Sequence, residues 1–125
     1  MENTEIIKAV SSSRHGLLAT ITRNGAVHTV LVNPFWEDSH NAIAVFSRRK
    51  SQKVTNLLAR TAATLTLIDG SKYFAMIGDA TVVDDPAVVT DCFAAFAGKY
   101  NRVPAQADDR VVIFVTVERT LGVPF

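Results

Sequence analysis

The chain has 125 residues, 48% hydrophobic and 20% charged, which suits one folded domain with one core and is unlike a disordered chain. Lys and Arg number 13 against 12 for Asp and Glu, so the net charge of +1 provides no general field for binding nucleic acid. The single cysteine excludes an internal disulfide, and no apolar run reaches the roughly 20 residues of a membrane helix. The N-terminus also lacks signal-peptide features, so we expect one cytoplasmic domain over residues 1–125 that binds no membrane.

The first predicted elements are a short helix and a hairpin. The helix runs from residue 3 or 4 to about residue 11, with apolar side chains at helical spacing. Residues 16–22 and 27–33 are rich in apolar and β-branched residues, which is typical of strands. Asn24-Gly25 lies between them and is the strongest short-range hairpin signal, so the two segments are expected to pair.

The middle of the chain predicts a strand followed by a helix. Pro34-Phe35-Trp36 is expected to end the second strand, because proline has no N–H for a sheet ladder, and residues 37–41 form a polar connector. Residues 42–47 predict a third strand. Residues 52–60 place their apolar side chains on one face, so they predict a short helix that Ser51 caps.

The last third predicts two long strands, a helix and a final strand. Residues 63–68 and 72–83 are separated by a turn, and Gly78 indicates a bulge or a barrel corner. Asp84-Asp85-Pro86 is typical of a helix start, so residues 87–100 are expected to be one helix. Its predicted buried stripe consists of Val89, Cys92, Phe93, Phe96 and Tyr100. Residues 101–109 form a loop, and residues 110–121 are the sixth strand.

These elements favour a mainly β fold with short helices. Hairpin turns connect most strands, whereas a doubly wound sheet needs a helix after almost every strand. We therefore predict a six-stranded antiparallel β-barrel with helices packed over its ends.

The densest group of polar residues is the segment 47–53, Ser-Arg-Arg-Lys-Ser-Gln-Lys, between a predicted strand and a predicted helix. A helix N-terminus offers unpaired N–H groups and partial positive charge, so this segment is a candidate phosphate cradle. A solvated turn is an equally open interpretation. Lys53 stands out, because a cation in the first turn of a helix is easier to explain with an anion nearby.

Other candidate sites find little support in the sequence. The three histidines have no partner at a metal-ligand spacing, so no metal is predicted. His28 is on a strand, where a histidine is more often packed or exposed than catalytic. No nucleophile or paired-carboxylate motif is present, so no catalytic residue is predicted, and Cys92 on the apolar stripe is interpreted as a buried, inert thiol.

Taken in order, several short motifs resemble the flavin-binding split-barrel family that includes pyridoxamine 5′-phosphate oxidases. The motifs are Leu18-Ala19-Thr20, Asn24-Gly25, Ser47 at a strand end, Ser51-Gln52-Lys53 with Asn56-Leu57, and Gly78. Residues 100–122 are similar to the branch that uses the deazaflavin coenzyme F420, within the group that contains F420-dependent biliverdin reductases. The resemblance covers residues 15–122.

The resemblance implies a split β-barrel homodimer with a cofactor in each groove at the subunit interface. It also implies a phosphate held by the segment matching residues 46–53 and a flat ring beside the second strand. The implied cofactor-binding residues are His28, Val30, Val32, Ser47, Arg48, Lys50, Ser51, Gln52 and Lys53. Substrate identity is not carried over, because this chain is short on the substrate side.

The implied reaction is hydride transfer from reduced F420 to an unsaturated small-molecule acceptor, such as a biliverdin, a quinone or an enone. In such enzymes the cofactor supplies the chemistry, which suits a chain without catalytic motifs. Two alternatives stay open at this point. The barrel can bind FMN instead, as an oxidase-like protein, or it can bind a flavin or deazaflavin without catalysing any reaction.

Overall fold

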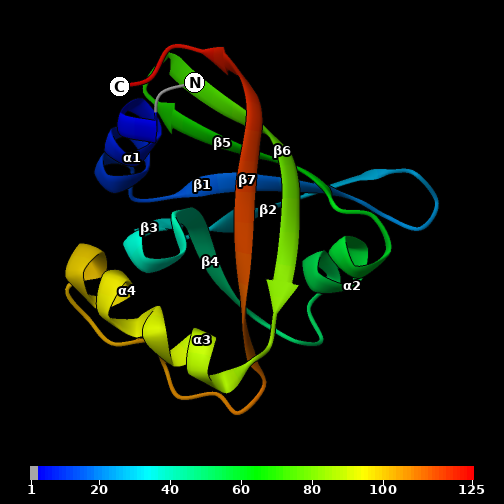
Figure 1. The fold of residues 1–125 in the computed structure, drawn as a ribbon. Coiled ribbons are helices and arrows are strands. Elements are labelled where there is room, and N and C mark those ends of the chain that lie inside the picture. Colours follow the sequence, from blue (N-terminus) through cyan, green and yellow to red (C-terminus); the bar gives the residue numbers. More distant parts are fainter. Residues whose placement is uncertain (1–2) are drawn as a thin grey trace.

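A computed structural model describes residues 3–125 as one seven-stranded antiparallel sheet with short helices around it (Figure 1). The strand order is β2-β1-β5-β6-β7-β4-β3, and the described ladder does not close. Both ends of the chain lie near helix α1, at the top of Figure 1. Within residues 3–125, no helix combines the length and the apolar character needed to cross a bilayer.

The helices and strands follow the predicted order with two differences. The helices are α1 (Asn3–Ser12), η1 (Asp38–His40, a 3-10 helix), α2 (Gln52–Ala59), α3 (Pro86–Asp91) and α4 (Phe93–Tyr100). The strands are β1 (Gly16–Ile21), β2 (Val27–Val32), β3 (Phe35–Glu37), β4 (Ala42–Arg48), β5 (Ala62–Asp69), β6 (Lys72–Val83) and β7 (Arg110–Gly122).

Sequence reasoning predicted six strands, but the sheet has a seventh, β3. Pro34 ends β2 as expected, yet Phe35 to Glu37 return to extended backbone and pair antiparallel with β4, Phe35 opposite Ala44. Phe35 and Glu37 are both buried. A three-residue strand is too short to show an alternating pattern in the sequence, and the elements it packs against, β4, α1 and α4, come together only in the folded chain.

The predicted helix over residues 87–100 is two helices that meet at Cys92. The Cys92 amide donates to the carbonyl of Val89 at 3.2 Å, a tighter turn than an α-helix makes, and α4 restarts at Phe93. The break rotates the apolar stripe: Val89, Cys92 and Phe96 are buried, whereas Phe93 is 38% exposed. The predicted stripe is therefore wrong at Phe93.

Two glycine predictions are confirmed. Gly25 adopts φ +85° in the turn between β1 and β2, a conformation that favours glycine. The β6–β7 register shifts between Ile77 and Gly78, so Gly78 marks a bulge. A Cβ at Gly78 would overlap the carbonyl of Thr116, which means that the two strands approach too closely for any other residue.

The two faces of the β4–β7 pair bury different cores. Alternate residues such as Val45 and Ile113 point into the barrel, where α1 and α2 contribute Val10 and Leu57 to the same cluster. The residues between them, including Val112, pack with α3 and α4 in a second cluster. The helical layer over the second face forms one wall of the site described below.

The outer face of β2, β1, β5, β6 and the end of β7 carries apolar side chains that no helix covers. Strand register aligns them in pairs: Leu17 with Leu31, Ile68 with Tyr73, and Ala75 with Leu121. The large exposed members of this apolar sheet face are Val27, Leu31, Ile68, Tyr73 and Leu121, each between 49% and 67% exposed. Large exposed apolar patches on folded domains are typical of interaction surfaces.

Candidate functional site

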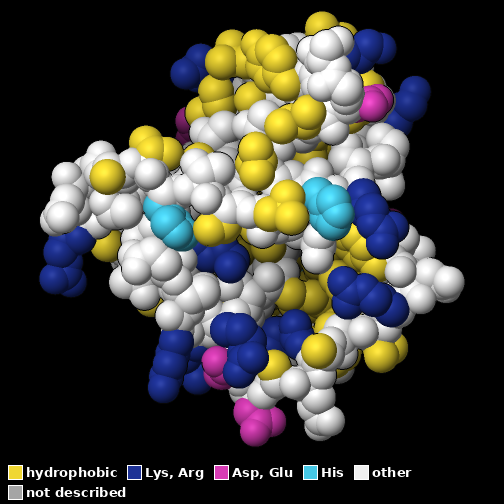
Figure 2. Space-filling model, turned by 180° about the vertical axis from the view of Figure 1, so that it is seen from behind, with side chains coloured by type: hydrophobic (Ala, Val, Ile, Leu, Met, Phe, Trp, Pro, Cys, Tyr) yellow, Lys and Arg dark blue, Asp and Glu magenta, His cyan; other side chains and the backbone are white. Residues whose placement is uncertain are grey.

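The sequence-predicted phosphate segment lies next to a pocket of about 250 Å³, which we call the cation pocket. The pocket is formed where the end of β2 meets β4, the start of α2, α4 and the loop that precedes β7. Its lining residues are Leu31, Val32, Asn33, Phe46, Lys53, Phe96, Arg102, Pro104, Ala105 and Arg110. Three of these are cations and none is acidic. The back view shows Lys and Arg side chains gathered in the lower half of the molecule, around exposed hydrophobic atoms (Figure 2).

Two of the three cations are held in place by aromatic rings. The guanidinium of Arg110 lies 5.2 Å from the centre of the Phe46 ring, and that of Arg102 lies 5.0 Å from the centre of the Phe96 ring. Cation–π contacts of this kind position a guanidinium without neutralising its charge. Both groups remain available for an anion.

None of the three pocket cations forms an ion pair with any residue between 3 and 125. Burial lowers the pKa of the Lys53 ammonium, and burial together with the nearby Arg48 charge lowers that of Arg110. Partly buried charges of one sign destabilise each other, and a bound anion would relieve that repulsion. The pocket therefore has the electrostatics of an anion-binding site.

The first turn of α2 adds backbone donors to this site. Ser51 is the N-cap residue as predicted, but its hydroxyl makes no capping bond to the helix. Instead Ser51 Oγ lies 2.8 Å from Ser47 Oγ, which fixes the two hydroxyls side by side. The amides at the start of α2 therefore have no side-chain cap, and uncapped helix N-terminal amides are ready donors to an anion.

Arg48 and Arg49 have acidic partners within the protein. Arg48 Nε donates to a carboxylate oxygen of Asp109, and the Arg49 guanidinium lies 3.6 Å from the carboxylate of Asp84. The Arg49 amide also donates to the Asp109 carbonyl at 2.9 Å. The two contacts to Asp109 tie the end of the 101–109 loop to the end of β4 and the turn that follows it, and the Arg49–Asp84 pair ties the same turn to the end of β6. We call these three contacts the loop latch. The hydrogen bond and charge of Arg48 lower the pKa of the Asp109 carboxyl.

The other predicted segment residues have separate surroundings. Gln52 Nε2 donates to Asn56 Oδ1 at 2.7 Å, and Asn56 Nδ2 donates to Thr20 Oγ1 at 3.0 Å, a chain of bonds that anchors α2 to β1. Lys50 is exposed at the tip of the turn and does not line the cation pocket.

The predicted ring-binding residues on β2 share one side of that strand. Val32 is buried and lines the cation pocket, Val30 packs against the barrel core, and His28 is half-buried further along. Among residues 3–125, His28 Nδ1 is buried without a hydrogen-bond partner. Leu31, on the opposite side of β2, reaches the pocket from the apolar sheet face.

Sequence reasoning missed Arg102 and Arg110 as site residues. Arg110 is brought to the pocket by the β4–β7 register, which places it directly opposite Arg48. Like charges in directly opposed positions destabilise a sheet, and the neighbouring Asp109 carboxylate offsets part of this repulsion. The sequence offers only a weak signal for either residue, since both are isolated cations flanked by ordinary loop and strand residues.

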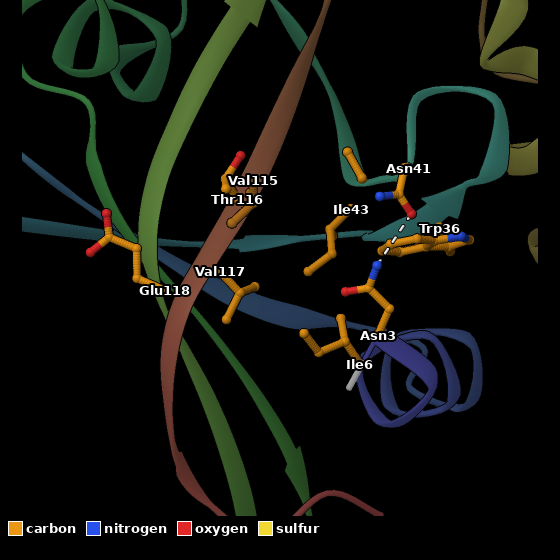
Figure 3. A pocket seen from close by; sticks show the side chains of 10 residues that line it. Asn3, Ile6, Trp36, Asn41, Ile43, Val115, Thr116, Val117 and Glu118 are labelled. Atoms are coloured by element: carbon orange, nitrogen blue, oxygen red, sulfur yellow. Dashed lines mark hydrogen bonds between the residues drawn. The ribbon is translucent and has the colours of Figure 1, made fainter. Parts of the chain in front are cut away.

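A second pocket, of about 220 Å³, lies between α1, the β3–β4 pair and β7 (Figure 3). Ile43, Val117 and the Trp36 indole provide apolar parts of its wall, and the Asn3 amide donates to Asn41 Oδ1 at 3.3 Å beside them. Glu118 projects to the other side of β7 (Figure 3). This pocket presents no cation and is not the candidate site.

No cluster of three His, Cys, Asp or Glu side chains suited to a metal ion occurs within residues 3–125. Burial, followed by the charges of Glu37 and Asp91, raises the pKa of the Cys92 thiol to about 12. The buried thiol is therefore protonated and unreactive at physiological pH.

Comparison with known proteins shows which proteins this chain and its fold resemble. The sequence profile described as Pyridoxamine 5'-phosphate oxidase matches residues 3–123. An F420H(2)-dependent biliverdin reductase from Mycobacterium tuberculosis is 32% identical over 115 residues, which cover 91% of this chain and 83% of that protein.

Two solved structures have similar folds. The conserved hypothetical protein Rv2991 from Mycobacterium tuberculosis superimposes with a TM-score of 0.85 at 25% identity, covering 99% of this chain and 85% of that one. A structure described as F420 Reductase superimposes with a TM-score of 0.70 at 24% identity, covering 90% of this chain and 93% of that one.

Proposed function

The chain belongs to the pyridoxamine 5′-phosphate oxidase family of split barrels, and from that premise we propose that it is an F420H2-dependent oxidoreductase acting on an unsaturated small-molecule acceptor. The 32% identical relative is named for F420H2-dependent reduction of biliverdin, a substrate of the proposed class. When bound, reduced F420 supplies the hydride, and the protein contributes binding, orientation and exclusion of water.

The observation that carries the proposal is the cation pocket. Lys53, Arg102 and Arg110 line a pocket that also contains the rings of Phe46 and Phe96, and they have no ion-pair partner in the described chain. F420 carries a phosphodiester followed by a lactyl and glutamyl tail, so it brings several separated negative charges. Arginine binds phosphate and carboxylate oxygens in pairs, whereas lysine acts as a point charge, so the mixed set suits an extended polyanion.

In this proposal the uncapped start of α2 and the paired hydroxyls of Ser47 and Ser51 hold the phosphate. Lys53 adds a cation beside them, and Arg102 and Arg110 hold the more distant anionic groups. The flat ring lies along β2, near Val32, with His28 and Val30 further along the same side. The remaining predicted contacts, from Arg48, Lys50 and Gln52, stay predictions.

We further propose that the active form is a homodimer joined through the apolar sheet face. Leu31 belongs to this face and also lines the cation pocket, so a second copy seated on the face would complete the pocket wall.

Leu31→Lys with Tyr73→Asp should convert a dimer to a monomer in sedimentation velocity. Leu58→Lys is the matched control, because Leu58 is 72% exposed on α2, outside the face. A protein that is monomeric without any substitution would contradict the proposal.

Parallel fluorescence titrations with F420 and FMN test the choice of cofactor. We expect F420 to bind at least about tenfold more tightly, because FMN has one phosphate and leaves two of the cations without a partner. Tight binding of FMN and none of F420 would overturn the proposal and support the FMN-binding alternative.

Turnover is tested separately from binding. Reoxidation of F420H2 is followed with the protein and biliverdin, a quinone or an enone, and compared with protein alone. We expect one of the three acceptor classes to accelerate reoxidation. Tight F420 binding without acceleration by any acceptor would favour the non-catalytic binding protein.

A further inference from the structure

Among the residues that line the cation pocket, Asn33 is the one polar side chain without a charge. It directly follows β2 and is exposed. Its Oδ1 lies 2.8 Å from Nδ1 of His15, a residue that does not line the pocket itself. We call this contact the His15–Asn33 pair.

The hydrogen bond of the pair sets the orientation of the Asn33 amide. An amide oxygen can only accept, so the proton of this bond belongs to His15 Nδ1. With Oδ1 turned to the histidine, the NH2 group is at the other end of the planar amide. Within residues 3–125, Asn33 Nδ2 donates to no acceptor. Its two N–H donors are therefore available to a ligand in the pocket.

Strand register brings the two side chains together. Gly16 at the start of β1 is opposite Val32 at the end of β2. His15 and Asn33 are the next residues outward on the same ladder, so their side chains meet where the hairpin leaves the sheet. The pair therefore depends on the β1–β2 hairpin and not on a mobile loop.

Helix α4 holds the backbone on both sides of the pair. The Tyr100 hydroxyl lies 3.0 Å from the carbonyl oxygen of Arg14 and 2.6 Å from that of Pro34, the neighbours of His15 and Asn33 in the chain. Binding groups keep a productive geometry when surrounding hydrogen bonds support them in this way.

We propose that Asn33 donates from Nδ2 to an anionic oxygen of the ligand in the cation pocket, and that His15 is a positioning residue that holds the amide in this orientation. Neutral N–H donors add contacts to an anion without adding to the repulsion among three like charges. The inference rests on the proposed function only for the identity of the ligand, F420. The contact itself requires a phosphate or carboxylate oxygen.

Inorganic pyrophosphate tests the anion contact without F420. In the 15N-labelled full-length protein, we expect pyrophosphate to shift the side-chain amide signals of Asn33 and to saturate. The amide of Asn3, which lines the second pocket, is the control and should not respond, because no cation lines that pocket. Lys53→Met should weaken the Asn33 response. Asn33 signals that stay in place, whether or not the amides at the start of α2 respond, would overturn the proposal.

Fluorescence titrations with F420 test the role of His15. Asn33→Leu should weaken binding about tenfold, the usual loss for one hydrogen bond to a charged group. His15→Phe should cause nearly the same loss, and the double variant should lose no more than Asn33→Leu alone, because His15 acts through Asn33. His15→Asn should retain affinity, since its amide N–H can take the place of Nδ1–H. Asn3→Leu is the matched control and should bind F420 normally.

Two outcomes of these titrations would contradict the positioning role. His15 and Asn33 are both exposed, so none of the variants should lower the melting temperature. A His15→Phe protein that melts earlier yet binds F420 normally would make the pair a structural contact only. Losses that add in the double variant would show that His15 acts independently of Asn33.

Shortened cofactors distinguish the two kinds of anionic oxygen. If the loss in Asn33→Leu persists with F420 that lacks its glutamyl residues, the contact is to the phospholactyl part, and if it disappears, the contact is to a glutamyl carboxylate. An equal loss with the deazaflavin riboside, which has neither group, would overturn the anion contact. If pyrophosphate shifts the Asn33 signals but F420 does not bind, the proposed cofactor is wrong and the Asn33 contact stands.

Discussion

The loop latch and the cation pocket are neighbouring regions that use the same kinds of side chain differently. In the latch, Arg48 and Arg49 are paired with Asp109 and Asp84 on the surface. In the pocket, Arg102 and Arg110 lie over aromatic rings with no acidic partner among the described residues. Lys53 belongs to the same basic run as Arg48 and Arg49 but lines the pocket, so the folded chain places cations of one run in two different settings.

The division follows from geometry. Arg48 and Arg110 are opposite each other in the β4–β7 ladder. Asp109 hydrogen-bonds to Arg48, whereas its charge acts on Arg110 without an ion-pair contact, and Arg110 lies over the Phe46 ring.

The largest expected effect is on ligand affinity when a pocket cation is removed. Lys53→Met keeps most of the side-chain volume and deletes the charge, so F420 binding should weaken by about 10- to 100-fold, the usual value of a charge-assisted contact. Stability should not fall, because burial of this ammonium is already unfavourable. Fluorescence titration and thermal melting measure the two quantities.

Lys50→Met is the matched control for that experiment. Lys50 lies in the same basic run but outside the pocket, so its removal should weaken binding only slightly. Equal losses of F420 affinity in the two variants would mean that the basic run of residues 47–53 acts only through its overall positive charge. The distinction between the cation pocket and the loop latch would then not hold.

A smaller and different effect is expected from Arg48→Met. The Arg48 and Asp109 side chains are 64% and 29% exposed, and exposed ion pairs contribute only about 0–1 kcal/mol. Affinity for F420 should therefore fall by less than about tenfold. The loop of residues 101–109 should become more sensitive to limited proteolysis, because the latch holds its end. A loss of affinity as large as that of Lys53→Met, with the loop still protected, would place Arg48 in the ligand site.

These expectations mark what the sequence can and cannot predict. The Asn24-Gly25 turn and the Gly78 bulge were predicted because each depends on backbone freedom within a few residues. The short strand β3 and the helix break at Cys92 were missed, because tertiary packing decides both.

The candidate site shows the same limit. The basic run could be located in the sequence, since a strand end beside a helix start is a local feature. The pairing of Arg48 with Asp109 and the contribution of Arg110 depend on the register of β4 against β7, two strands separated in sequence by α2, β5, β6, α3 and α4. The position of Lys53 in the first turn of a helix distinguishes it locally from Arg48, but nothing local to Arg48 shows that it pairs with Asp109.

The smallest effect concerns the pH dependence of the latch. The pKa of Asp109 is lowered below its ordinary value of 3.8, first by the hydrogen bond from Arg48. A carboxyl whose pKa is lower in the folded state than in the unfolded state stabilises the protein at pH values above its unfolded-state pKa. This stabilisation is lost as the pH falls through the folded-state pKa. Asp109→Asn should therefore unfold at a slightly lower urea concentration at neutral pH, with the difference from the unsubstituted protein shrinking as pH falls below 3.8.

Asp108→Asn is the control, because Asp108 makes no ion pair within residues 3–125. Its difference in stability from the unsubstituted protein should not shrink in this way. If both variants approached the unsubstituted protein in stability as the pH falls, the loss of stability in acid would come from general charge repulsion. The loop latch would then be a surface contact that does not stabilise the loop.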